Sequence, residues 1–349
     1  MKRKPLIIGT LLFAVMFLLS CSMTSQIVVK VQKPAAIYLP GVKKIAIADF
    51  SGPDRSGSQI ATMVQSMLMS THYFDIMERS ELRRILEEQN LGLSGVVDET
   101  TAARVGKLLG VDALIFGEVT TYKVEPDERG VEKVRRKVGT GRYEWVEQKN
   151  IFTGKKKKVK KEIMKTVLVD QHYRIRRGTV AINFRVVGVE TGKLLAARSD
   201  SKSYSSGKVV EGSWKTLKPK GEILADLSRA LCQKFVHLIA PYYVTEKRVI
   251  EPGRGDIKVG MKYAQAGLWP EATEAWKRAV VEFPKNPAAF YDLGLSYEVQ
   301  GMLDKAEKAY QSAVRLKQKK LYMEALARIR RAKREHEKLM KQLEERNIK

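Results

Sequence analysis

The sequence contains few cysteines and histidines and no long apolar run. Its 349 residues include two cysteines and four histidines. Cys21 and Cys232 cannot build a disulfide framework or a CxxC ligand pair. The histidines are scattered over the chain, at positions 72, 172, 237 and 336. The apolar run at residues 6–19 is shorter than the roughly twenty residues of a membrane-spanning helix. A disulfide scaffold, a histidine-based metal centre and a multi-span membrane protein are therefore excluded.

Acidic residues are also scarce relative to basic ones. The chain has 64 Lys and Arg against 39 Asp and Glu, a formal net charge of +25. With 44% hydrophobic, 30% charged and 8% aromatic residues, the composition is typical of a globular protein, and the length fits about two domains with appendages. Such a positive excess indicates an anionic partner, which could be nucleic acid, a membrane surface or an anionic polymer.

The first twenty residues predict export. Lys2, Arg3 and Lys4 precede the apolar run, which is the organisation of a signal peptide. The following Leu-Leu-Ser-Cys, ending at Cys21, resembles the lipobox of bacterial lipoproteins, which implies cleavage after residue 20 and acylation of Cys21. A plain signal peptide and an uncleaved anchor are the alternatives. Cleavage would leave 61 basic and 39 acidic residues, a charge of +22. Export favours an anionic envelope partner over nucleic acid.

The body of the chain begins with an α/β pattern. Short apolar runs at 44–50, 72–77 and 112–122 predict strands. Helical periodicity follows Ser56 or Ser58, either of which could cap the helix, begins again after Ser80, and covers residues 99–109. An amphipathic helix at 218–240 carries Ile223, Leu227, Ala230, Leu231, Phe235 and Leu238 on one face. Alternating strands and helices predict an α/β domain over residues 42–243. We expect residues 21–41 to form a tether behind the lipid and residues 244–253 to form a linker.

Three segments of this domain carry a family resemblance. They are IAIADFSG (45–52), FDIMERSELRRILEEQNLGLSG (74–95) and VDETTAARVGKLLGVDALIFGEV (97–119), while residues 180–198 fit a later hairpin. Together they resemble the curli production assembly/transport component family, CsgG. The resemblance implies an α/β domain with a mixed sheet, in outer-membrane lipoproteins that form a ring through which curli subunits pass. The domain is also similar to activator lipoproteins of peptidoglycan synthases.

Two features of the sequence argue against a pore. The connection from Phe50 to Ile60 is too short for the constriction loop of secretion-channel members. The region 123–177, where channel members have a membrane hairpin, holds 18 Lys and Arg against 8 Asp and Glu, a net charge of +10. Lipid-facing lysine or arginine near the bilayer midplane costs about 2–4 kcal/mol each. Residues 200–220 are too short and polar for a second membrane hairpin.

The basic insertion at 123–177 needs its own interpretation. Alternation at Val134, Val138, Tyr143 and Trp145 predicts an extended hairpin, with its tip near Gly154. The hairpin could be a solvated arm, a cationic contact for lipid phosphate, glycan or an acidic partner, or a nucleic-acid surface with stacking aromatics. Export disfavours the last. The candidate contact residues for an anionic surface are Lys155, Lys156, Lys157, Lys158, Lys160 and Lys161.

The C-terminal third contains an internal repeat. A shift of 34 residues aligns Gly260 with Gly294 and Trp276 with Tyr310, together with Tyr263 and Tyr297 and several alanines. This period and pattern predict two tetratricopeptide (TPR) repeats at 254–319, followed by a basic capping helix at 320–349. Small residues allow the paired helices to approach, and the aromatics fill the gap between them. We predict a protein-binding surface with Tyr263, Trp276, Tyr297 and Tyr310 as candidate residues.

No motif in the sequence predicts catalysis. P-loop spacing, HExxH and a GxSxG elbow are all lacking, and no cofactor or metal site is predicted. Asp49, at a strand end, is better explained as a turn cap than as a catalytic carboxylate. The sequence therefore predicts a non-enzymatic lipoprotein on the periplasmic side of the outer membrane, acting as an assembly, secretion or scaffold factor. It could form a homo-oligomer. The alternatives are an adaptor or activator of a peptidoglycan synthase and, more remotely, an envelope glycan hydrolase.

Overall fold

The computed structural model describes residues 25–78, 84, 106–149 and 154–347. These residues form two compact units. Residues 42–239 form one, called here the α/β unit. The described residues up to Gly41 and those from Ala240 onward form the other, called here the helical unit. The predicted helix after Ser80 and most of the predicted helix at 99–109 lie outside the described residues.

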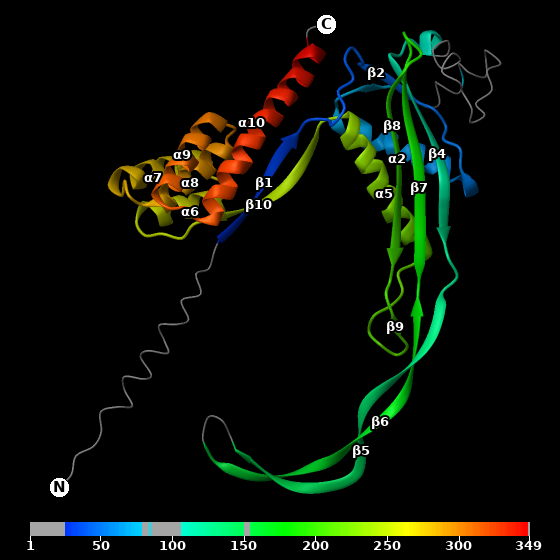
Figure 1. Cartoon of the computed structure of the whole chain (residues 1–349), viewed down its shortest axis with the longest axis vertical. Helices are drawn as coiled ribbons and strands as arrows, with labels where there is room; N and C mark the ends of the chain where they lie inside the picture. The colour runs from blue at the N-terminus through cyan, green and yellow to red at the C-terminus, as the bar shows by residue number, and fades with distance from the viewer. Residues whose placement is uncertain (1–24, 79–83, 85–105, 150–153, 348–349) are drawn as a thin grey trace. The chain divides into compact units, whose positions relative to one another are not determined.

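The α/β unit is built on a five-stranded sheet with the order β3-β2-β4-β7-β8 (Figure 1). β2 (Lys44–Ile47) is parallel to β3 (Asp75–Ile76) and to β4 (Ala113–Val124). β7 (Arg177–Gly188) is antiparallel to β4 and to β8 (Leu194–Ser205). Parallel and antiparallel pairs in one sheet confirm the predicted α/β fold with a mixed sheet.

Two helices, α2 (Ser56–Thr71) and α5 (Lys220–Ile239), pack against this sheet. A single 3-10 turn, η1 (Pro53–Arg55), leads from the sheet into α2. Alternate β7 residues face the helices, because a strand presents every second side chain to one side. Phe184 of β7 is 1% exposed, and its ring stacks on Phe235 of α5 with centroids 4.3 Å apart. The predicted apolar face of α5 is therefore its packing face, with Ile223, Leu227, Leu231 and Phe235 all buried.

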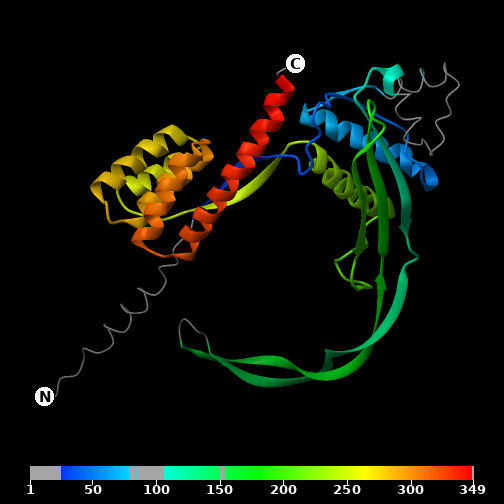
Figure 2. The same ribbon diagram turned by 45° about the horizontal axis from the view of Figure 1, so that its top comes forward.

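Beyond the core sheet the chain forms a long hairpin, seen in both views as a two-stranded extension of β4 and β7 (Figures 1 and 2). β5 (Glu128–Lys149) and β6 (Lys156–Ile175) pair antiparallel, with a register shift between Gly139 and Tyr143. The short β9 (Val209–Val210) pairs with β6 near its base. Within the part of the chain that the structure describes, β5 has no neighbour on its other edge. We call β5 and β6 the basic hairpin.

The helical unit contains two helix pairs and a long last helix. The first pair is α6 (Asp256–Gln265) with α7 (Trp269–Glu282), and the second is α8 (Pro287–Val299) with α9 (Leu303–Leu316). α10 (Lys320–Asn347) packs against the second pair through Tyr322, Ala325 and Ile329. This agrees with the predicted helical repeats and capping helix. Assignment to the TPR family remains a prediction.

The structure corrects the predicted tether and linker. Residues 25–33 of the tether form β1 (Ser25–Lys33), and most of the linker belongs to β10 (Tyr242–Ile250). The two strands pair antiparallel along their whole length, and we call them the β1–β10 ribbon. Ile27, Val29 and Ile250 join a buried cluster with Trp276 and Leu295 of the helices. The ribbon is therefore part of the core of the helical unit.

Candidate functional site

Two of the four aromatic residues predicted to bind a partner lie inside the helical unit. Trp276 and Tyr310 are both 0% exposed. A Cβ atom on Gly260 would come within 2.6 Å of the Trp276 indole nitrogen, and one on Gly294 within 2.8 Å of the Tyr310 ring. The prediction that Trp276 and Tyr310 contact a partner is therefore wrong, because these side chains fill the space between paired helices and leave no free surface.

Tyr263 and Tyr297 instead line an open groove of about 440 Å³ between the helix pairs. The Tyr263 side chain is 37% exposed and Tyr297 is half-buried. Lys305 places its ammonium group 5.8 Å from the centre of the Tyr297 ring, and Lys277 bonds Glu274 at 2.6 Å. The groove thus combines two aromatic faces with a charged rim, a surface suited to a polypeptide segment.

A buried ion cluster ties the ribbon to the helices beside this groove. The Glu298 carboxylate, 9% exposed, accepts hydrogen bonds from Arg248 of β10 at 3.0 Å and from Arg328 of α10 at 2.8 and 2.9 Å. The Tyr310 hydroxyl donates to it at 2.6 Å. Burial alone would raise the pKa of Glu298, but the bonds and charge of Arg328, the Tyr310 bond and the Arg248 charge outweigh burial and lower it. The carboxylate therefore stays ionised inside the unit.

A second buried carboxyl lies on α8. Asp292 is 0% exposed, and one of its oxygens accepts a hydrogen bond from the backbone N–H of Glu251 at 3.0 Å. No cation pairs with it among the described residues, so burial raises the pKa of this carboxyl well above its usual range. Asp292 and Glu298 thus lie six residues apart on the same helix with opposite pKa shifts. Asp292 thus joins α8 to the residue that follows β10, and Glu298 joins α8 to β10 itself.

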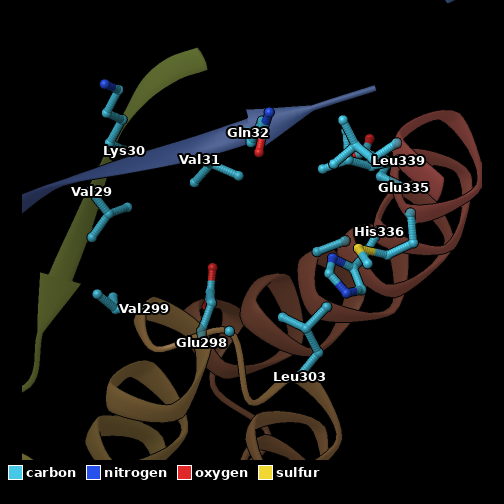
Figure 3. A pocket seen from close by; sticks show the side chains of 14 residues that line it. Val29, Lys30, Val31, Gln32, Glu298, Val299, Leu303, Glu335, His336 and Leu339 are labelled. Carbon is cyan, nitrogen blue, oxygen red and sulfur yellow. The ribbon is translucent and has the colours of Figure 1, made fainter. Parts of the chain in front are cut away.

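A further pocket, of about 260 Å³, lies between β1, the α8–α9 corner and α10. Figure 3 shows Val29 and Val31 pointing into it from β1, facing Leu303 and the α10 residues His336 and Leu339. Its lining is mostly apolar. Farther along, the Gln342 amide of α10 bonds the backbone N–H and C=O of Ala35, at 3.0 and 3.1 Å. α10 is thereby fixed along the chain that follows β1.

The basic hairpin separates its predicted contact lysines onto two faces. Residues directly opposite each other in an antiparallel pair share a face. Lys160 lies opposite Trp145, which is 69% exposed, and its ammonium group is 4.7 Å from the centre of the Tyr143 ring. Lys156 and Lys158 share this face. Lys157 and Lys161 lie on the other face, with Val146 and Val159, and Lys155 precedes the strand. One face is therefore aromatic and cationic.

An ion pair at the base of the hairpin fixes its junction with the core sheet. The Arg176 guanidinium donates two hydrogen bonds to Asp127, at 2.7 and 2.8 Å, and a third to the Lys218 carbonyl at 2.8 Å. Both side chains of the pair are 15% exposed. The Arg176 hydrogen bonds hold the pKa of Asp127 below its ordinary value. Sequence reasoning missed this pair, because Asp127 and Arg176 are brought together only when β5 and β6 close.

The two cysteines have different positions. Cys21 lies outside the described residues, so its acylation remains a prediction. Cys232 on α5 is 0% exposed, and burial raises the pKa of its thiol to about 12. A neutral, buried thiol is a packing group and a poor nucleophile.

Within the described ranges, no three His, Cys, Asp or Glu side chains are grouped to hold a metal ion. None of the helices in these ranges combines the length and the apolar character needed to cross a membrane.

Comparison with known proteins adds the family. Residues 42–215 match the family described as "Curli production assembly/transport component CsgG". Similar solved structures include lipoprotein GNA1162 from Neisseria meningitidis, at 14% identity over 55% of this chain and 97% of that one, with a TM-score of 0.30. A PelC dodecamer from Paraburkholderia phytofirmans is 12% identical over 61% and 98%, with a TM-score of 0.27. The LpoB C-terminal domain from Salmonella enterica is 6% identical over 47% and 84%, with a TM-score of 0.26. The comparison with curated proteins gives no match.

Proposed function

We propose that this chain, which belongs to the CsgG family through residues 42–215, is a non-enzymatic envelope lipoprotein that acts as an assembly or secretion scaffold. Cys21 carries the lipid and holds the chain at the periplasmic side of the outer membrane. The helical unit binds a protein partner, and the basic hairpin contacts an anionic surface or a neighbouring subunit. The proposal rests mainly on one observation, the open groove with Tyr263 and Tyr297 on a helical unit separate from the CsgG-family domain.

The groove has the construction of a binding surface. Its aromatic side chains are presented by helices whose spacing is fixed by the buried Trp276 and Tyr310. Exposed tyrosines on a rigid frame contribute much of the binding energy at protein interfaces, because little conformational entropy is lost when they are covered. The chemistry of the groove is compatible with a scaffold and with an activator of a peptidoglycan synthase, so the identity of the partner distinguishes the two.

Replacing both Tyr263 and Tyr297 with alanine is expected to reduce partner capture at least about tenfold, since each exposed aromatic anchor contributes roughly 1–2 kcal/mol. The measurement is cross-linking and affinity capture from envelope membranes, quantified by mass spectrometry. Phe283→Ala is the matched control, because Phe283 is 43% exposed on the same unit and lies outside the groove.

Equal capture by the double variant and the control would contradict the groove proposal. A captured peptidoglycan synthase would support the activator alternative, whereas captured sister copies or an exported substrate would support the scaffold. After detergent extraction a scaffold ring should appear as a discrete high oligomer, and a clean monomer would rule the ring out.

The two faces of the basic hairpin provide a second test. Changing Lys156, Lys158 and Lys160 to glutamine is expected to weaken binding to anionic vesicles or glycan by about tenfold or more, at roughly 1 kcal/mol per lysine. The control is Lys157→Gln with Lys161→Gln on the opposite face, which should change binding less. Co-sedimentation of unlipidated Cys21→Ser protein at low and high salt measures this. Binding that is unaffected by salt and by both sets of substitutions would exclude a cationic contact.

A further inference from the structure

The start of the β1–β10 ribbon is close in the chain to the proposed lipid attachment site. β1 begins at Ser25, four residues after Cys21. Four residues span at most about 14 Å even when fully extended. If Cys21 is acylated, as the proposed function states, the first strand of the helical unit must begin within that distance of the membrane surface. The acylated Cys21 would then hold the helical unit close to the membrane.

The two faces of the ribbon differ in what covers them. Its inner face packs on the helices through Ile27, Val29 and Ile250. Figure 3 shows the alternation directly, with Val29 and Val31 pointing toward the helices and Lys30 pointing away. The side chains of the outer face are exposed, and they include Gln26, Val28, Lys30, Tyr243, Thr245 and Lys247.

The outer face has the chemistry of a membrane interface. Val28 is 63% exposed and Tyr243 is 57% exposed, and the Lys30 ammonium group lies 4.3 Å from the centre of the Tyr243 ring. Lys247 lies opposite Val28. Glu246 lies between Thr245 and Lys247 in β10, but its side chain is on the inner face. There its carboxylate bonds Arg248 at 2.5 Å and lies 3.5 Å from the ammonium group of Lys33. The outer face therefore carries lysines, a tyrosine and a valine without a compensating acid.

α6 lies beside the start of β1 on the side where the helices pack, because Ser25 shares the inner face of the strand with Ile27 and Val29. The Gln265 amide bonds the Ser25 hydroxyl at 2.5 Å, which places the end of α6 beside the start of β1. Lys262 and Lys258 are exposed, three and seven residues before Gln265, and so lie on the same side of the helix. The acid of this helix, Asp256, is paired with Arg278 of α7 at 3.0 Å.

We infer that the outer face of the β1–β10 ribbon rests on an anionic lipid bilayer, with Val28 and Tyr243 at headgroup depth and the lysines against lipid phosphates. Tyrosine favours this depth because its ring is apolar and its hydroxyl is hydrated, and lysine can extend its ammonium group to the phosphates. The acylated Cys21 keeps the ribbon close to the membrane surface. The helices pack on the other side of the ribbon, so the ribbon separates them from the membrane.

The test uses the full lipidated chain in vesicles containing phosphatidylglycerol, with an environment-sensitive fluorophore on Val28→Cys. Cys232 is buried and Cys21 is acylated, so the introduced thiol takes the label. The matched control is Val281→Cys. Val281 is 80% exposed on α7, and it lies about 140° around the helix from Trp276, which packs toward the ribbon. The probe at position 28 should shift to shorter wavelength and be quenched by spin-labelled lipid, and the probe at 281 should do neither.

Removing the two ribbon lysines, with Lys30→Gln and Lys247→Gln, should lower the fraction of the position-28 probe in contact with lipid by about tenfold. Equal exposure of the probes at 28 and 281 in protein that floats with the vesicles would overturn the inference. Protection of position 28 in native envelopes but not in vesicles would also overturn it, since a protein would then cover the face. Two other measurements test the proposed lipid anchor separately. If Cys21 is not acylated, mass spectrometry will show its peptide without the added acyl mass, and the protein will not float with the vesicles.

Discussion

Replacing Val29 with aspartate will unfold the helical unit. Val29 is 6% exposed and belongs to the cluster that includes Trp276 and Leu295. Its partner across the ribbon is Glu246, so the new carboxylate would face an existing one. Burying an ion without a partner costs several kcal/mol. We expect a loss of roughly 3–5 kcal/mol in the free energy of unfolding of this unit, a large fraction of the roughly 5–15 kcal/mol that stabilises a typical domain.

The measurement must report on the helical unit alone, because the chain has two compact units. Hydrogen exchange of peptides from α6 to α9 provides this, and we expect it to accelerate strongly in Val29→Asp. Val28→Asp is the control, since the neighbouring side chain points to the other face of the strand and is 63% exposed. If both variants exchange as the unchanged protein does, residues 25–33 are a tether after all.

Replacing Glu298 with glutamine will have the second large effect. Glutamine keeps the shape of the side chain but removes the charge that Arg248 and Arg328 share. Arg248 retains Glu246, whereas Arg328 loses its bidentate carboxylate partner. Leaving a buried charge unpaired costs about 3–5 kcal/mol. We expect a loss near the lower end, about 3 kcal/mol, because one of the two arginines keeps a partner.

The pH dependence of this effect has a definite sign. The folded pKa of Glu298 lies below the unfolded value, which is close to the ordinary 4.5. Its stabilisation is therefore fully present above about pH 4.5 and is lost as the pH falls through the folded pKa. Denaturant unfolding curves of the unchanged protein and Glu298→Gln should differ most near neutral pH and converge in acid.

An exposed ion pair on the same unit provides the control for the buried cluster around Glu298. Glu274 and Lys277 bond at 2.6 Å on α7, and their side chains are 62% and 46% exposed. Glu274→Gln should change stability by less than about 0.5 kcal/mol, since water and salt screen an exposed pair. An equally small effect for Glu298→Gln would mean that the buried cluster contributes little to holding the ribbon on the helices.

The 34-residue repeat made the packing between the paired helices predictable from the sequence. The spacing of Gly260 and Trp276, repeated at Gly294 and Tyr310, predicts that an aromatic ring fills the space above a glycine. The repeat also predicts partner binding by Tyr263, Trp276, Tyr297 and Tyr310, and it does not distinguish the buried members of this set from the accessible ones. Helical periodicity shows that a residue faces a neighbour, but it does not show how much of the ring that neighbour covers. Only the packed helices leave Tyr263 exposed and Tyr297 half-buried and cover the other two completely.

The basic hairpin also combines a feature that the sequence predicts with one that only the paired strands define. Alternation around Tyr143 and Trp145 predicts extended chain, and the structure has β5 and β6 there. Which lysines accompany the aromatics depends on the register between the strands, because a shift of one residue would exchange the faces. The irregularity between Gly139 and Tyr143 sets that register for Trp145 and Lys160. It cannot be located from either strand alone.

The sequence alone predicts the α/β domain and the paired helices, since both follow from periodicities within short segments. It did not determine the β1–β10 ribbon. β1 shows alternation at Ile27, Val29 and Val31, but in β10 two inward positions are the charged Glu246 and Arg248, which hide the pattern. Those charges are tolerated inside because Glu246 and Arg248 bond each other and because Lys33 and Glu298, from distant parts of the chain, pair with them. Contacts between distant parts of the chain therefore place residues 25–33 of the expected tether and most of the expected linker in one ribbon in the core of the helical unit.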